Sequence, residues 1–212
     1  MLSFPAQNWQ KAAVAVSRTK GTHPGSRFGR TASLIVPRVY LSDAYTATND
    51  EELVRLGITH VISVIEYVLD IPKCIEDSNK LHIRLHDHPQ ADLLAHLDET
   101  TNFIQSALSE NKTNKVLVHC FQGISRSATV VCAYLIATTD KTAPDSIAFV
   151  KAQRGIVCPN SGFQKQLGEY ASKFIGNRAG RAATPLARLS VSIADRIKSL
   201  RGGTVPSTVV GT

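Results

Sequence analysis

The sequence predicts a single α/β domain with a central, mostly parallel β-sheet that is flanked by helices on both faces. This follows from apolar segments of strand length that alternate with segments of helical periodicity, without an internal repeat. The chain has 212 residues, of which 43% are hydrophobic and 19% are charged. These values allow one well-buried domain of ordinary globular composition with short extensions.

The first half of the domain is expected to follow a β-α-β order. Residues 49–57 are predicted as a helix because Asn49 is a suitable N-cap and Gly57 a suitable stop. Strands are expected at residues 33–43, which hold two short ones, and at residues 59–65 and 81–87.

The second half continues the alternation. A helix is expected to start at Asp92, whose side chain can cap it, because apolar residues recur at near-helical spacing as far as Leu108. An apolar strand is then expected at residues 115–120. Three further helices are expected at residues 127–139, 145–155 and 161–174, the last capped by Asn160 or Ser161.

The net charge of +7 lies in the two ends of the chain. Residues 1–31 hold five Lys or Arg and no acid, and residues 177–212 hold six Lys or Arg and one acid. Residues 32–176 hold 13 basic and 16 acidic side chains and are therefore net negative by three. We expect a basic, disordered arm at 1–31, the folded domain at 32–176, and a linker with a basic amphipathic helix and tail at 177–212.

The amphipathic helix is expected at residues 184–201. Its apolar residues recur at three and four positions, at Leu186, Leu189, Ile193, Ile197 and Leu200, and basic side chains occupy other positions. Such a helix could dock on the domain, bind a partner protein or lie on an anionic membrane, and the sequence leaves these alternatives open.

Two observations bear on the cellular compartment. No run of about 18 apolar residues predicts a membrane span, and the N-terminal residues lack the pattern of a signal peptide. The four cysteines have neither C-x-x-C nor zinc-type spacing, which predicts free thiols in a cytoplasmic and/or nuclear protein. Cys132 is expected in the core. Cys74 or Cys158 could form a disulfide with Cys120, if the thiol of Cys120 is oxidised, and so act as a resolving thiol.

The segment HCFQGISRS, residues 119–127, predicts an anion-binding turn between an apolar strand and an apolar helix. A helix N-terminus presents unpaired N–H groups and the positive end of the helix dipole. Gly123 lets the loop turn its amides inward, and the guanidinium of Arg126 matches two phosphate oxygens. The expected phosphate-binding residues are Phe121, Gln122, Gly123, Ile124, Ser125 and Arg126.

Cys120 is the expected nucleophile of this turn, because the field that binds a phosphate dianion also favours a thiolate. A lower thiol pKa raises the fraction of thiolate at neutral pH, but it also lowers the nucleophilicity of the thiolate. These two effects on the rate nearly cancel. Most of the catalysis is therefore assigned to in-line positioning and to stabilisation of the transferring phosphoryl group by Arg126 and the loop amides. Ser127 could donate its hydroxyl to the sulfur, and His119 is expected to be buried and to orient the loop.

These residues resemble a known signature. HCFQGISRS is similar to the H-C-x-x-G-x-x-R-[S/T] motif of the tyrosine phosphatase superfamily, in the G-x-S-R-S form of the dual-specificity phosphatases. The resemblance covers residues 32–176 and includes YLSDAYTATN and AFVKAQRGIVCPNSGFQKQL. It implies the fold of these phosphatases, a phosphocysteine intermediate, and neither metal nor cofactor. Within the family, the chain resembles the small, atypical members that lack a rhodanese-like module.

The resemblance also places a general acid at Asp87. An alkoxide or phenoxide leaves poorly unless it is protonated, so the reaction needs such a group. Asp87 lies in LHDHPQADLL at the end of an expected strand, which matches the family's loop aspartate in order and spacing. Asp92 is expected to be a cap, and His86 and His88 are expected to be surface residues.

The implied function is hydrolysis of phosphotyrosine and phosphoserine or phosphothreonine in proteins. The loop departs from the family at Gln122 and Ile124, and it lacks the Lys that phosphoinositide phosphatases often place there. The basic ends keep open a phosphatase of RNA 5′ ends or phosphoinositides, although no specific nucleic-acid binding is expected. A non-catalytic phosphoprotein-binding module is least favoured, because Cys120 is present.

Overall fold

The computed structural model describes residues 31–182 and contains a five-stranded sheet with the order β1-β2-β5-β3-β4. The strands are β1 (Ser33–Val36), β2 (Val39–Ser42), β3 (His60–Val64), β4 (Lys80–Ile83) and β5 (Val116–His119). β1 pairs antiparallel with β2, and the other three pairs are parallel. The sheet is therefore mostly parallel, and β5 is its central strand.

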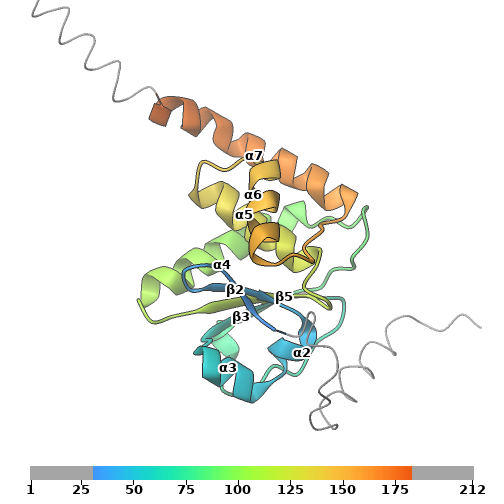
Figure 1. Ribbon diagram of the computed structural model, residues 1–212, viewed down its shortest axis with the longest axis vertical. Helices are drawn as coiled ribbons and strands as arrows, with labels where there is room; N and C mark the ends of the chain where they lie inside the picture. Colours follow the sequence, from blue (N-terminus) through green and yellow to red (C-terminus); the bar gives the residue numbers. More distant parts are fainter. Residues whose placement is uncertain (1–30, 183–212) are drawn as a thin grey trace, which may run out of the picture. The chain divides into compact units, whose positions relative to one another are not determined.

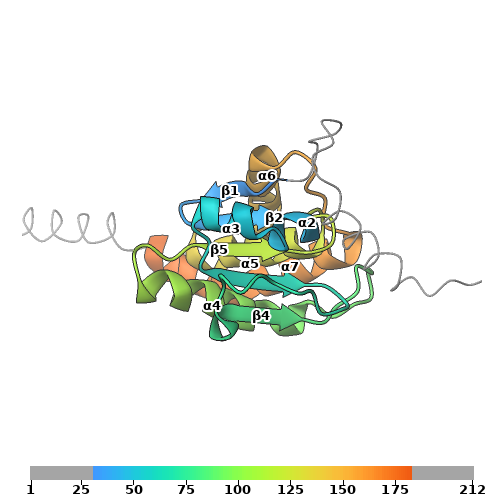
Figure 2. The same cartoon turned by 90° about the horizontal axis from the view of Figure 1, so that it is seen from below.

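Helices cover both faces of this sheet (Figure 1). They are α2 (Ala44–Ala47), α3 (Asp50–Leu56), α4 (Leu97–Glu110), α5 (Arg126–Thr138), α6 (Ala143–Gln153) and α7 (Ser161–Ala182), with the 3-10 turns η1 (Asp77–Asn79) and η2 (Leu94–His96). α2 and α3 lie on one side, and α4, α5 and α6 lie on the other (Figure 1). Figure 2 shows β1 and β4 at opposite edges of the sheet. This arrangement confirms the α/β class expected from the sequence.

Local capping signals set the ends of α3 and α6. The side chain of Asn49 accepts the N–H of Glu52, and Gly57 ends α3 with a left-handed φ of +69°, both as predicted. α6 begins at Ala143, slightly before the expected start, because Thr142 and Asp145 form a capping box.

Two expected boundaries in the segment before α4 are wrong. β4 ends at Ile83 rather than near residue 87, because its pairing with β3 stops there, and the carbonyl of Leu85 accepts a hydrogen bond from the Arg126 side chain instead of from a strand. The Asp92 side chain accepts the N–H of Ala95 in η2, whose N-cap residue is Leu93, and α4 itself starts only at Leu97. Asp92 therefore bonds to the start of a helical turn, but this turn is a 3-10 turn that precedes α4.

α7 is longer than expected. It is capped by Asn160, whose side chain accepts the N–H of Phe163, and it continues through Ala182. The first residues of the expected linker are thus helical, in keeping with the strong helix propensity of Ala and Arg. The expected N-terminal arm, apart from Thr31, and the expected helix at 184–201 lie outside the described residues. None of the helices in the described part is long and apolar enough to cross a membrane.

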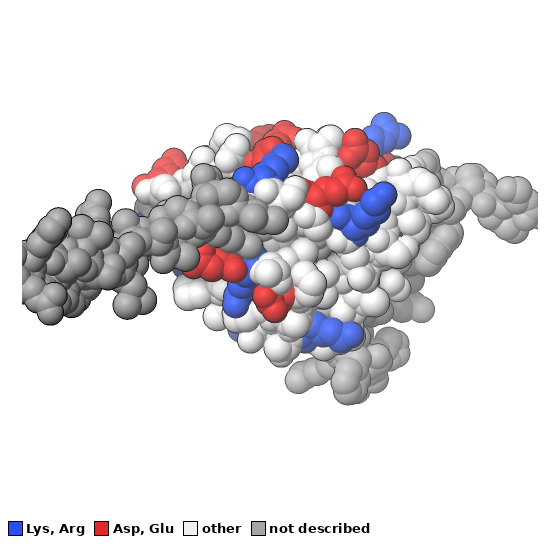
Figure 3. Space-filling model, turned by 90° about the horizontal axis from the view of Figure 1, so that it is seen from above, with Lys and Arg blue, Asp and Glu red and all other residues white. Residues whose placement is uncertain are grey.

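The residues of β3 and β5 are all buried, as is nearly every residue of α5. The segment between β5 and α5 is therefore anchored at each end to a buried element. This segment is the expected phosphate-binding loop. On the face shown in Figure 3, acidic and basic side chains are interspersed and form no continuous patch of one sign. This face agrees with the nearly balanced charge of the central part of the chain.

Candidate active site

The candidate site lies at the carboxyl ends of the parallel strands, where open α/β sheets place their ligands. Cys120 follows β5 directly, and Asp87 follows β4 after three connecting residues. Glu66, two residues beyond β3, was not among the expected site residues. Because neighbouring parallel strands end at the same edge, the fold brings these three side chains from distant parts of the sequence to one place.

The loop from Cys120 to Arg126 is held by its carbonyl groups. All five carbonyl oxygens of residues 121–125 accept hydrogen bonds from donors outside the loop. The donors are Ala44 N, Arg154 Nη2 and Nε, Cys158 N, and Thr129 N and Oγ1, at 2.8–3.4 Å. Because a peptide's N–H points away from its C=O, these bonds turn the loop amides toward the inside of the turn, where an anion can bind.

Gly123 is required at the apex of this loop. Its φ of +70° lies in the left-handed region. A Cβ at this position would lie 2.5 Å from the carbonyl oxygen of Ser42 and 2.8 Å from Nη2 of Arg154. The prediction that Gly123 shapes the turn is therefore supported both by its backbone conformation and by its close contact with β2.

Arg154 is a site residue that was not expected from the sequence. Its side chain is buried, and its guanidinium donates to the Gly123 carbonyl at 3.0 Å and to the Thr31 carbonyl at 2.8 Å. It also contacts the Gln122 carbonyl at 3.4 Å. A signal was present, because Arg154 lies in the segment AFVKAQRG that carries the family resemblance, but nothing in its sequence neighbourhood indicates burial.

Cys120 is only 1% exposed, and its sulfur accepts two hydrogen bonds. One comes from the N–H of Gly123 and the other from the hydroxyl of Ser127, both at 3.2 Å. Ser125 is the N-cap residue of α5, yet its side chain makes no capping bond to the helix. The N-terminus of α5 therefore presents its positive end to the loop without a side-chain cap.

His119 is fully buried, as expected, and lies beneath the loop. Its Nε2 is 2.7 Å from Oγ of Ser63, and its Nδ1 is 3.3 Å from the carbonyl oxygen of Cys120. Burial lowers the pKa of His119 to about 4, so the imidazole is neutral at physiological pH. A neutral ring bonded on both sides orients the start of the loop.

Arg126 is held from two directions. Its Nη1 forms a buried ion pair with Glu66 and a 3.0 Å hydrogen bond to the carbonyl oxygen of Leu85. Its Nε makes no hydrogen bond and lies 3.6 Å from Oδ2 of Asp87. The guanidinium is thus fixed in orientation and keeps a donor at the loop, which suits a phosphate oxygen.

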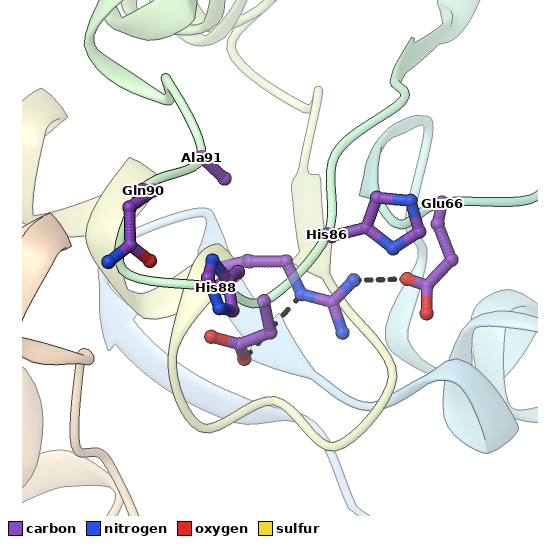
Figure 4. Close-up of a pocket in the computed structure, with 7 residues that line it drawn as sticks. Glu66, His86, His88, Gln90 and Ala91 are labelled. Carbon is purple, nitrogen blue, oxygen red and sulfur yellow. Dashed lines mark hydrogen bonds and ion pairs between the residues drawn. The ribbon is translucent and has the colours of Figure 1, made fainter. Parts of the chain in front are cut away.

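Asp87 lies beside the loop, in the position expected of a general acid. Its Oδ1 accepts hydrogen bonds from Ser125 Oγ at 2.8 Å and from Asn160 Nδ2 at 2.9 Å. A cavity of about 580 Å³ opens here, lined by Glu66, His86, Asp87, His88, Gln90, Ala91 and Arg126. Figure 4 shows His86 and Glu66 on one side of it and Gln90 and Ala91 on the other. The two histidines are exposed, as expected, and they form part of the wall.

The other three cysteines lie in different surroundings from Cys120. Cys132 is buried in α5, as expected, and burial raises the pKa of its thiol to about 12. Cys74 and Cys158 are exposed, and all four cysteines are free thiols. Partial desolvation and the neighbouring Asp50 carboxylate raise the pKa of the Cys74 thiol to about 11, which disfavours it as a nucleophile at neutral pH. Within residues 31–182, no group of three His, Cys, Asp or Glu side chains could hold a metal ion.

The site combines a strand-loop-helix turn with inward-facing amides, a buried cysteine whose sulfur accepts two hydrogen bonds, and an adjacent aspartate. The family model of the dual specificity phosphatase catalytic domain matches residues 39–173. The chain therefore belongs to the dual specificity phosphatase family, which confirms the fold and the phosphatase function expected from the sequence.

Relatives of known name agree with this assignment. The chain is 39% identical over 148 residues to dual specificity protein phosphatase 13B of Mus musculus, covering 65% of this chain and 74% of that protein. It is 41% identical over 139 residues to dual specificity protein phosphatase 26 of Homo sapiens, covering 64% of this chain and 65% of that protein.

Solved structures show the same fold. The crystal structure of DUSP15 has a TM-score of 0.63 and 34% identity, and the match covers 68% of this chain and 88% of that one. A mouse putative dual specificity phosphatase complexed with zinc tungstate has a TM-score of 0.64 and 28% identity, covering 76% of this chain and 97% of that one.

Proposed function

We propose that this phosphatase hydrolyses phosphotyrosine and phosphoserine or phosphothreonine in proteins through a phosphocysteine intermediate on Cys120. The observation that carries the proposal is the convergence of Cys120, Arg126 and Asp87 on one loop whose amides are turned inward. The names of the relatives support protein substrates and dual specificity. The lack of a Lys in the loop gives no support to a phosphoinositide substrate.

In the first step, the thiolate of Cys120 attacks the phosphorus in line with the leaving oxygen. The S–P bond forms as the P–O bond breaks, the bonding electrons pass to the leaving oxygen, and Asp87 donates a proton to it. The loop amides and Arg126 stabilise the charge on the transferring phosphoryl group. The products are a free hydroxyl side chain, phosphocysteine and the carboxylate of Asp87.

In the second step, water attacks the phosphocysteine, and the carboxylate of Asp87 takes its proton. The S–P bond breaks and the electrons return to the sulfur, which restores the thiolate and releases inorganic phosphate. The Ser127 hydroxyl, 3.2 Å from the sulfur, stabilises the departing thiolate with its hydrogen bond. The step needs no further reactant.

Single-turnover hydrolysis of a tyrosine-phosphorylated and a threonine-phosphorylated peptide, without added metal, tests this proposal. We expect the wild type to hydrolyse both, Cys120→Ser to hydrolyse neither, and Asp87→Ala to be slower by about 100-fold or more. Failure of the folded wild type on both peptides would contradict the proposal. Parallel assays with phosphoinositide and 5′-phosphorylated RNA would then identify the substrate class.

The proposal extends to the compartment and the C-terminal extension. Four free thiols support a reducing location, the cytoplasm and/or the nucleus.

The basic amphipathic pattern at residues 184–201 supports contact with a partner protein or an anionic membrane. Co-sedimentation of the full chain and of a chain ending at residue 182 with anionic and neutral vesicles tests the membrane contact. Equal binding of the two chains would contradict it.

A further inference from the structure

Asp87 belongs to a closed ring of hydrogen bonds with Ser125 and Asn160. The backbone N–H of Asn160 donates to Ser125 Oγ at 3.1 Å, and this hydroxyl donates to Asp87 Oδ1 at 2.8 Å. The side-chain amide of Asn160 donates to the same Oδ1 at 2.9 Å. The ring joins three segments: the acid loop, which we define as residues 84–93 between β4 and η2, the phosphate-binding loop between β5 and α5, and the start of α7.

The direction of each bond in the ring is determined by its surroundings. Asn160 Oδ1 accepts the N–H of Phe163 at 2.9 Å as the N-cap of α7, so the NH₂ group of the same amide must face Asp87. Ser125 Oγ already accepts a backbone N–H, so its own proton is available for Asp87. Both donors therefore converge on one oxygen of the carboxylate.

The first turns of α7 also hold the backbone of the acid loop. A Cβ on Gly162 would lie 1.8 Å from the carbonyl oxygen of Pro89, so the loop rests directly on the helix backbone at this point. The Gln166 side chain donates to the Ala91 carbonyl at 2.8 Å and accepts the N–H groups of residues 93 and 94 at 2.9 and 2.8 Å. The start of α7 thus supports the loop that carries Asp87 through both packing and hydrogen bonds.

From this geometry we propose that Asn160 is a positioning residue for the general acid, and that Asp87 delivers its proton from Oδ2. Oδ1 is occupied by two hydrogen-bond donors, whereas Oδ2 lies 3.6 Å from Nε of Arg126, the side chain that would hold the phosphate. A carboxylic acid whose Oδ1 is bound in this way carries its proton on Oδ2. The inference rests on the proposed function, because it concerns the acid of that reaction.

Asn160→Ser tests the positioning role without removing the helix cap. Serine is as good an N-cap as asparagine, but its side chain lacks the amide that donates to Asp87. We expect kcat/KM for a phosphotyrosine peptide, whose leaving group needs a proton, to fall about 10-fold to 100-fold. For difluoromethylumbelliferyl phosphate, whose leaving group departs without one, kcat/KM should stay within about threefold.

Gly162→Ala provides an independent second variant, because its methyl group must displace the Pro89 carbonyl and with it the acid loop. Gly162→Ala should therefore also lower kcat/KM for the phosphotyrosine peptide more than kcat/KM for difluoromethylumbelliferyl phosphate. Gly168→Ala is its matched control on the same helix, since no atom lies within 4 Å of the added Cβ. Asn114→Ala is the control for Asn160, because its amide also donates to a carbonyl and to a carboxylate, far from the site.

The outcomes separate this inference from the proposed function. If Asp87→Ala changes the activity ratio and Asn160→Ser does not, the positioning role is overturned and the proposed mechanism stands. An equal loss on both substrates in Asn160→Ser would instead assign Asn160 to the structure of the phosphate-binding loop, and would also overturn the positioning role. If Asp87→Ala itself leaves the ratio unchanged, the general-acid assignment fails, and the inference fails with it.

Discussion

Arg154 and Gly123 are joined by a hydrogen bond of 3.0 Å from the guanidinium Nε to the carbonyl oxygen of the loop glycine. This bond joins the C-cap residue of α6 to the centre of the loop between β5 and α5. Since the same guanidinium also contacts the Gln122 carbonyl, Arg154 fixes two consecutive peptide groups. The planar guanidinium of arginine can donate to several carbonyl groups at once, whereas the single ammonium group of a lysine cannot reach all of these acceptors.

We predict that Arg154→Lys lowers the free energy of unfolding by about 1–3 kcal/mol, because carbonyls lose their buried donors. It should also weaken binding of vanadate, a phosphate-like oxyanion, because the loop amides are no longer held inward. Urea denaturation and vanadate titration measure the two effects. Arg55→Lys is the matched control, since Arg55 lies exposed on α3. Unchanged vanadate affinity in folded Arg154→Lys would contradict the role assigned to Arg154.

Gly123→Ala should abolish activity regardless of the leaving group. The added Cβ meets the backbone of Ser42 at 2.5 Å, and alanine at a φ of +70° costs about 1–2 kcal/mol by itself. The loop must therefore move, and the in-line geometry at Cys120 is lost with it. Activity on difluoromethylumbelliferyl phosphate and the urea midpoint are the measurements.

Gly168→Ala, the matched control for Gly123→Ala, is expected to be more stable than the wild type and fully active. Gly168 lies inside α7, and an added Cβ would have no atom within 4 Å, so Gly168→Ala should raise the free energy of unfolding by about 0.5–1 kcal/mol. Its activity should equal that of the wild type. A Gly123→Ala protein as active as Gly168→Ala would show that the loop tolerates the displacement.

Glu66 and Arg126 form an ion pair whose loss should be costly. Their side chains are 9% and 5% exposed, and removal of one partner leaves the other charge buried without compensation. We predict that Glu66→Ala lowers the free energy of unfolding by about 3–5 kcal/mol. The ion pair of Glu52 and Arg55 is the comparison, because Arg55 is 66% exposed and Glu52→Ala should cost no more than about 1 kcal/mol. Equal losses in the two variants, measured in urea, would contradict this prediction.

The parts of the site that lie close together in the sequence could be predicted. Cys120, Gly123, Arg126 and Ser127 fall within one strand-loop-helix junction, where spacing alone determines which groups meet. The alternation of apolar strands and helices likewise predicted the sheet, because periodicity reports which face of an element is buried. Asp87 was found through its order and spacing in the family pattern.

The supporting residues could not be predicted, because their contacts span long stretches of chain. Arg126 meets Glu66 across 60 positions, and Asn160 meets Asp87 across 73. Such pairs depend on where the loops run after each strand, which local propensity and periodicity do not specify. Asn160 was expected only as a helix cap, and its second bond to the acid loop required the folded structure. The Asp92 error is of another kind, since an Asp cap signals a turn start without distinguishing a 3-10 turn from an α-helix.

His119 should make the stability of the fold depend on pH in the acid range. Burial lowers its pKa in the folded state to about 4, whereas an unfolded histidine titrates near about 6.5. Between these values the unfolded chain binds a proton that the folded chain does not, so the free energy of unfolding falls as the pH decreases. The contribution of His119 is complete above about pH 6.5 and is lost toward pH 4, at up to about 1.4 kcal/mol per pH unit.

Urea denaturation of the wild type and of His119→Gln at several pH values between 7 and 4 isolates this contribution, because all other titrating groups are common to both proteins. Glutamine keeps a side-chain amide that can pair with the hydroxyl of Ser63, but it does not titrate. The difference in unfolding free energy between the two proteins should therefore shift steadily in favour of the variant as the pH falls. A difference that stays constant over this range would mean that His119 titrates alike in the folded and unfolded chains, contrary to its complete burial beneath the loop.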